Sequence, residues 1–147
     1  AQKGGLREWE SSPEGCAALI ILLDQLSRNI SRDQAQMYAG DARARQLSLQ
    51  MIEDGRDKQL GLHPRVFTYM PLMHAEDLLA QEKGVALFEA LAAEAGEHAE
   101  DVSNFAPYAI MHRDVVKQFG RFPHRNEILG RETTDAEREF LKTGRGF

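Results

Sequence analysis

Apolar residues recur at three- and four-residue spacing along nearly the whole chain, and no segment alternates apolar and polar residues as a β-strand does. This spacing places apolar side chains on one face of successive α-helices. The first helix is expected to begin at Ser12, a favoured capping residue, with Pro13 at its first position. Its apolar stripe comprises Cys16, Leu19, Ile20, Leu23 and Leu26. The chain is therefore predicted to be all-α.

Capping residues and breakers predict where the following helices begin and end. Residues 29–33 are expected to form a break, and residues 34–38 a short helix. Asp41 is a suitable cap for a third helix, which Gly55 is placed to end. These signals indicate short connections between closely spaced helices.

Two prolines mark the middle of the chain. Pro64 and Pro71 each suit the start of a helix, because proline lacks the N–H group that an interior position would use. A short helical turn is therefore expected over residues 63–69, and a long helix over residues 72–95.

Two further helices are expected towards the end of the chain. Ser103 is a candidate cap for a helix that Gly120 ends. Thr134 and Glu137 have the spacing of a capping box, in which each side chain bonds the backbone of the other residue. That pair predicts the start of the last helix.

The length of 147 residues suits a single domain over residues 1–147. No repeat of fixed period, low-complexity tract or linker divides it, so we expect one set of stacked antiparallel helices. The net charge of −5, with both signs interspersed, gives no general attraction for nucleic acid or anionic membranes. Nucleic acid is therefore not an expected partner, and the oligomeric state stays open.

The apolar run over residues 16–23 is far shorter than the roughly 20 residues that a spanning helix needs. Neither a membrane span nor an export signal is predicted. The single cysteine, Cys16, lies in this run and is expected to be a small buried side chain that forms no internal disulfide. A reducing compartment follows, and the protein is expected to be cytoplasmic.

The densest polar segment covers residues 112–126 and contains His112, Arg121, His124, Arg125 and Asn126. His112 shares its helical stripe with apolar residues, so its ring should face inward. It is either a core histidine held by hydrogen bonds or a residue that contacts a ligand and transfers a proton. His124 is the second candidate for proton transfer.

The loop before Asn126 allows two interpretations. Asn126 could cap a short helix over residues 127–129, and free N–H groups there would join Arg121 and Arg125 in attracting an anion. Alternatively, the loop is a structural latch, in which Phe122 fills the core and the arginines pair with acidic side chains. The sequence does not decide between them.

Two other helices carry candidate ligand-binding residues. Asp24 and Arg28 are four residues apart, which favours an ion pair within one helix. Alternatively, Asp24 orients Arg28 towards a ligand carboxylate or phosphate, and Asn29 adds a hydrogen bond. His74 and Asp77 begin a stripe that is polar at one end and apolar at the other, as expected for the edge of a pocket.

The motifs of several well-defined sites are missing from the sequence. There is no glycine-rich phosphate loop, no nucleophile elbow, no Cys-x-x-Cys pair and no metal-binding His-Glu-x-x-His. No metal and no cofactor are therefore expected, and whether the protein is an enzyme stays open.

Four blocks together carry a resemblance to a known family: residues 22–30 (LLDQLSRNI), 69–77 (YMPLMHAED), 112–130 (HRDVVKQFGRFPHRNEILG) and 133–137 (TTDAE). Over nearly its whole length the chain resembles the bacterial family called domain of unknown function 924. The resemblance implies a helical fold similar to tetratricopeptide-like arrays, and it brings no established activity. It also implies that this chain lacks the opening segment of family members, which usually begin with another helix.

The leading hypothesis is that inward-facing arginine, histidine and asparagine side chains bind a small anionic ligand, a phosphate or a carboxylate. The ligand-binding candidates are Arg28, Asn29, His74, Asp77, Arg121, Arg125 and Asn126, with acid–base chemistry by His112 or His124. The alternative is a non-enzymatic, tetratricopeptide-like scaffold that binds an acidic peptide or a partner protein. A closed pocket would favour the first hypothesis, and an open groove with apolar anchors the second.

Overall fold

The computed structural model describes residues 1 and 4–144, which form helices joined by turns, with no strand among them. The all-α prediction is confirmed. In the labels used below, η marks a 3₁₀ turn or, for η2, a π-helical turn. The helices are η1 (Arg7–Ser11), α1 (Pro13–Ile21), η2 (Leu22–Leu26), α2 (Ser27–Ile30), η3 (Ala35–Tyr38), α3 (Asp41–Glu53), η4 (Arg56–Gln59), α4 (Leu62–Met73), α5 (Leu78–Glu94), η5 (Gly96–His98), α6 (Ala99–Val102), α7 (Phe105–Phe119), η6 (Pro123–Arg125) and α8 (Asp135–Lys142).

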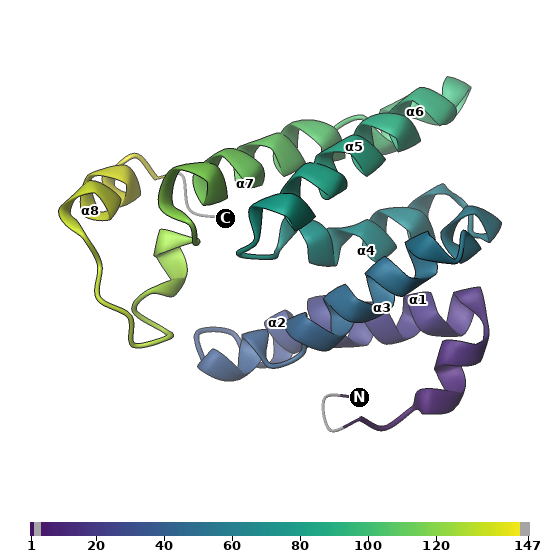
Figure 1. Ribbon diagram of the computed structural model, residues 1–147, viewed down its shortest axis with the longest axis horizontal. Coiled ribbons are helices and arrows are strands. Elements are labelled where there is room, and N and C mark those ends of the chain that lie inside the picture. Colours follow the sequence, from purple (N-terminus) through teal and green to yellow (C-terminus); the bar gives the residue numbers. More distant parts are fainter. Residues whose placement is uncertain (2–3, 145–147) are drawn as a thin grey trace.

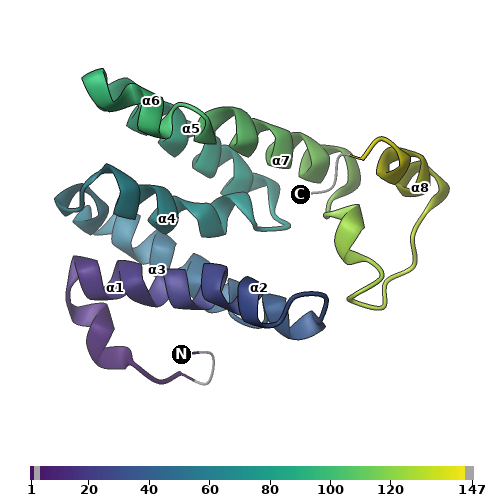
Figure 2. The same cartoon turned by 180° about the vertical axis from the view of Figure 1, so that it is seen from behind.

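The longer helices lie side by side, with α4 in the middle (Figure 1). One apolar cluster joins α1 to α3 around Leu19 and Met51, and another joins α4, α5 and α7 around Tyr69 and Phe88. The view from behind shows α8 beyond the end of α7, away from the other long helices (Figure 2). Within the part of the chain that the structure describes, no helix has the length and apolar character needed to cross a membrane.

The first helix begins as predicted, because the Ser12 hydroxyl accepts a hydrogen bond from the N–H of Gly15 at 3.1 Å. It continues into the π-helical turn η2, which has more residues per turn than an α-helix. The wider turn rotates Leu26 away from the buried stripe, and this side chain is 43% exposed. The expectation that Leu26 joins the core is therefore wrong.

Asp41 does not cap α3, contrary to the prediction, because Gly40 occupies the capping position. A Cβ atom on Gly40 would lie 2.3 Å from the carbonyl oxygen of Leu23, so only glycine fits there. Asp41 is the first residue of the helix instead, and its carboxylate faces Arg28. Gly55 follows the helix with a positive φ of 69°, as its predicted role as a terminator requires.

The predicted break before Pro71 is wrong, because α4 runs through this proline to Met73. Proline at this interior position removes one helical hydrogen bond and crowds the preceding turn, but Pro71, Leu72 and Met73 are all buried, so packing outweighs this local cost. The chain then turns, and the Asp77 carboxylate accepts a hydrogen bond from the N–H of Ala80 at 3.1 Å to begin α5. The turn between α4 and α5 therefore contains His74.

The later helix boundaries agree only in part with the sequence. The capping position of α7 is Asn104 and not Ser103, whereas Gly120 ends this helix with a φ of 70°. The capping box of Thr134 and Glu137 is present. The helix expected after Asn126 is not formed, because the 3₁₀ turn η6 lies before this residue.

Candidate functional site

A polar pocket of about 350 Å³ lies between η3, the start of α3, the turn after α4 and the segment after α7. η3 and α3 are neighbours in the sequence and the other two elements are distant from them, yet all four meet on the side of the molecule nearest α8 (Figure 1). The residues that line the pocket are Tyr38, Asp41, Ala42, Arg45, Pro71, His74, Ala75, Glu76, Arg125 and Leu129.

The most deeply buried charge beside the pocket is the carboxylate of Asp24, which is 1% exposed. Its two oxygens lie 2.8 and 2.9 Å from Nδ1 of His74. It also accepts hydrogen bonds from Gln25 and, at 3.2 Å, from Arg28. Burial raises the pKa of Asp24, but the charge and hydrogen bond of His74, followed by Arg28 and Gln25, outweigh burial and lower it to about 2. Asp24 is therefore ionised.

Arg28 joins two carboxylates instead of pointing at an open space. The same Nη2 atom that bonds Asp24 lies 2.9 Å from Asp41. Burial raises the pKa of Asp41, and the charges of Arg28 and Arg125 oppose this effect. The ion pair with Asp24 that the spacing favoured is thus present, and it extends to a second helix.

Arg125 is the most enclosed cation of the pocket wall, with 7% of its surface exposed. Its guanidinium carbon lies 4.7 Å from the ring centre of Tyr38 and 4.4 Å from that of Phe122, so the group is stacked on aromatic faces. Nη2 donates to the carbonyl oxygen of His74 at 3.0 Å, and Nη1 lies 3.7 Å from Asp41. Its Nε atom is buried and has no hydrogen-bond partner. Burial lowers the pKa of Arg125.

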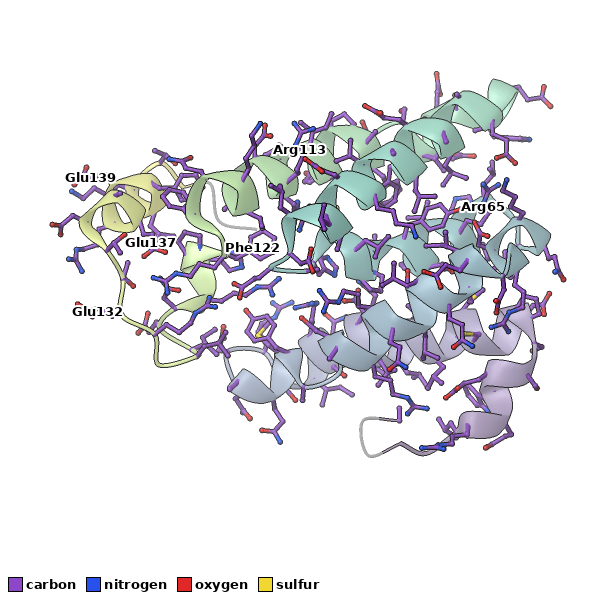
Figure 3. The ribbon with its side chains drawn as sticks, in the orientation of Figure 1. Arg65, Arg113, Phe122, Glu132, Glu137 and Glu139 are labelled. Carbon is purple, nitrogen blue, oxygen red and sulfur yellow. The ribbon has the colours of Figure 1, made fainter. Side chains whose placement is uncertain are left out.

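The segment after α7 is held in place by Glu76. The carboxylate of Glu76 accepts the backbone N–H of Phe122 at 2.8 Å and two bonds from Arg131, at 2.6 and 2.9 Å. Arg131 also donates to the carbonyl oxygen of Phe122. Phe122 is fully buried, just beyond the end of α7 (Figure 3). This part of the loop is a structural latch, one of the two interpretations that the sequence allowed.

Arg121 and Asn126 belong to a different network from the pocket. Arg121 binds both carboxylate oxygens of Glu137, at 2.6 and 2.8 Å, and the side-chain amide of Asn126 donates to Glu137 and Thr133 at 3.3 Å. Glu137 lies on the side of α8 that faces this segment (Figure 3). The two residues attach α8 to the molecule, and neither is among the described residues that line the pocket.

The two histidines proposed for proton transfer lie near the pocket but not on its described wall. Nδ1 of His112 is 2.8 Å from the carbonyl oxygen of Tyr108, and its ring centre is 6.1 Å from that of His74. Burial is the main reason why the pKa values of His112 and His124 are both lowered to about 4. Both imidazoles are therefore neutral at neutral pH.

The other predicted ligand-binding residues lie further out. Asn29 is exposed on α2. Asp77 caps α5, and its second oxygen is 3.3 Å from Arg45 at the pocket edge. Arg45 and Asp41 line the pocket but were not predicted as site residues from the sequence. They are four residues apart on one helix and therefore share a face, so they could have been grouped. Tyr38 also lines the pocket, but no pattern in the sequence indicates this position.

Among residues 1 and 4–144, no group of three or more His, Cys, Asp or Glu side chains could hold a metal ion.

Comparison with known proteins places the chain among uncharacterised relatives. The structure is similar to that of a protein of unknown function from Agrobacterium tumefaciens, with a TM-score of 0.85 and 40% sequence identity, covering 96% of this chain and 74% of the other. A comparison with curated proteins gave no match. A family described as "Bacterial protein of unknown function (DUF924)" matches residues 1–145. Because the match begins at residue 1, it does not support the expectation of a missing opening segment. The chain belongs to this family.

Proposed function

We propose that the protein binds a small molecule with a carboxylate or phosphate group in the pocket between α3, the turn after α4 and the segment after α7. The observation that carries the proposal is Arg125, a cation on the pocket wall that is more than nine-tenths buried and has an Nε atom without a partner. A buried donor that lacks a partner costs free energy, which a ligand oxygen would recover.

The charges around the pocket leave Arg125 the least compensated. Glu76 is neutralised by two bonds from Arg131, and Asp41 lies closer to Arg28, at 2.9 Å, than to Arg125, at 3.7 Å. Arg45 stands at the rim in a partly exposed pair with Asp77, which gives little stability and is easily exchanged for a ligand. The enclosed Arg125 and the partly exposed Arg45 would bind the anion from two sides.

The pocket volume of about 350 Å³ suits a small molecule better than a protein segment. His74 and Arg125, two of the residues expected to bind the ligand, line the pocket, whereas His112 is not among its described lining residues. A cytoplasmic location belongs to the proposal, because Cys16 is a free buried thiol.

The test is a thermal-shift assay with inorganic phosphate, nucleotides and small carboxylates. A ligand at 100 times its dissociation constant adds about 2.7 kcal/mol, which raises the melting temperature by several degrees. Arg45→Gln should remove most of the shift without disturbing the stack around Arg125. Arg138→Gln is the matched control, because this exposed arginine also pairs with one carboxylate, on α8, and should leave the shift intact. A shift that is equal in both variants would contradict the proposed site.

A second candidate, the partner-binding scaffold, has its own supporting observation. Leu22, Leu26 and Ile30 line an apolar groove of about 500 Å³ beside Leu6, and Ile30 is 74% exposed. The partner would be an amphipathic helix with apolar residues at helical spacing. Affinity capture with wild-type protein and Ile30→Glu tests this function, since only wild-type protein should retain such a partner.

A further inference from the structure

The Asp24 carboxylate and the His74 ring are in direct contact, and the binding of an anion in the pocket does not require this contact. The carboxylate is buried behind the pocket, whereas His74 lines it with 15% of its side chain exposed. Both oxygens of Asp24 lie within 2.9 Å of one ring nitrogen, Nδ1. The ring therefore connects a buried negative charge to a space that a small molecule can enter.

The contact with Asp24 determines which ring nitrogen carries the proton. Because an ionised carboxylate only accepts hydrogen bonds, Nδ1 of His74 must donate. In the neutral ring, Nε2 then has a lone pair and can accept a proton. Nε2 is the ring nitrogen that is not in contact with Asp24, and His74 is one of the residues that line the pocket.

The backbone on both sides holds this arrangement in place. Asp24 lies in the π-helical turn η2, a local irregularity that is frequent at functional sites. His74 ends α4, and its carbonyl oxygen accepts a hydrogen bond from Arg125. The imidazole is therefore fixed by a carboxylate at Nδ1 and by an arginine at its own backbone.

The other two histidines of this region are arranged differently. Nδ1 of His112 faces a carbonyl oxygen of its own helix, a neutral acceptor that cannot compensate a positive ring. Burial lowers the pKa of both His112 and His124 to about 4, so each resists taking up a proton. His74, in contrast, has an ionised carboxylate at hydrogen-bond distance.

We propose that His74, oriented by Asp24, is the proton acceptor of an enzyme active site in this pocket. The inference rests on the proposed function, in which an anionic substrate group is held by Arg45 and Arg125. Nε2 takes a proton from a hydroxyl group of the substrate or from a water molecule. The O–H bond breaks, its electron pair stays on the oxygen, and an Nε2–H bond forms.

Asp24 would act as a positioning residue in this step, without touching the substrate. Its negative charge offsets the positive imidazolium that forms, and the proton is later returned to the product or to solvent. Arg28 and Arg125 also face this region and oppose the uptake of a positive charge, so the charge of Asp24 is needed close to the ring.

Reaction of the folded protein with diethyl pyrocarbonate tests the proposal without a known substrate. This reagent modifies neutral imidazole nitrogens, and peptide mass mapping gives a separate rate for each of the five histidines. We expect His74 to react faster than the exposed His63 and His98, despite its lower exposure. A buried histidine with a merely structural role would react more slowly than both, and that result would overturn the proposal.

Asp24→Asn supplies the matched change, since it keeps the shape of the side chain and removes its charge. The rate at His74 should fall roughly tenfold, the change that about 1.4 kcal/mol of lost charge stabilisation produces. An unchanged rate in a folded variant would overturn the role of Asp24. If the variant does not fold, the proposal is still tested in the wild-type protein, where the reaction rate of His74 is compared with the rates of His63 and His98.

Inorganic phosphate separates this proposal from the anion site. Protection of His74 by phosphate, lost in Arg45→Gln, supports both the reactive histidine and the bound anion. A fast reaction at His74 that phosphate does not slow would leave the proton acceptor in place and remove the proposed anion site. A slow reaction at His74 together with a thermal shift by phosphate would leave the anion site in place and overturn the role of His74 as a proton acceptor.

Discussion

The buried imidazole of His112 makes the stability of the fold depend on pH. Burial is the largest cause of its low pKa, and the charges of His74, Arg125 and His124 add to it, so that the value falls from 6.5 to about 4. Unfolding restores the ordinary pKa. Between these two values the unfolded chain therefore binds one more proton than the folded protein does. The free energy of unfolding should fall as the pH falls through this window, and it should be independent of His112 above it.

The size of the effect follows from the displacement of the pKa. One extra proton in the unfolded state changes the free energy of unfolding by about 1.4 kcal/mol per pH unit at its steepest. Over the whole window from 6.5 to about 4, His112 should contribute roughly 3 kcal/mol to the loss of stability. The side chain is 6% exposed, so solvent screening reduces this value little.

The assay is urea unfolding followed by circular dichroism at several pH values across this window. His112→Gln should give a line of free energy against pH that is shallower than that of wild-type protein by about 1 kcal/mol per pH unit. His63→Gln, which changes an exposed histidine, should leave the slope unchanged. A part of the slope should remain in His112→Gln, because the pKa of His124 is lowered as well. Parallel lines for His112→Gln and wild-type protein would show that the reasoning is wrong.

Three further predictions concern packing and the attachment of the last helix. Gly40→Ala should destabilise the protein by about 2 kcal/mol in chemical unfolding, because its Cβ would lie 2.3 Å from the Leu23 carbonyl oxygen, whereas Gly61→Ala has open space and should change little. Glu137→Gln should weaken the bonds that attach α8, so that hydrogen exchange over residues 135–142 becomes faster than in wild-type protein, whereas exchange over α4 stays unchanged. Cys16, fully buried and with a pKa raised by burial, should react with thiol reagents only at the rate of unfolding.

Local signals in the sequence predicted several helix ends correctly, but other helix ends depend on packing and were predicted wrongly. The caps at Ser12 and Thr134 and the terminators Gly55 and Gly120 depend on neighbouring residues alone, and all four were found as expected. The boundary at Pro71 failed, because the last residues of α4 are buried and their packing outweighs the local cost of a proline. The caps expected at Asp41 and Ser103 are equally local signals and were wrong, because Gly40 and Asn104 occupy those capping positions.

The pocket could be predicted only in part, because its pairs join residues that are far apart in the sequence. Asp24 was expected to pair with Arg28 or to orient it, four residues away, but its carboxylate also contacts His74, fifty residues away. Periodicity shows which side chains face inward, but not which helices meet. For this reason Arg125 and His74 were named as candidates without their shared contact, and Tyr38 was missed.

The stack in which Tyr38 and Phe122 enclose Arg125 has a consequence for protein synthesis. The ribosome delivers the early helices, with Asp24 and Asp41, long before it adds the residues that complete the pocket. A nascent chain that stops before residue 121 lacks both Arg125 and the aromatic ring beneath it. The pocket therefore forms only after residue 125 has been translated, and products that terminate before it should neither bind the ligand nor be stabilised by it.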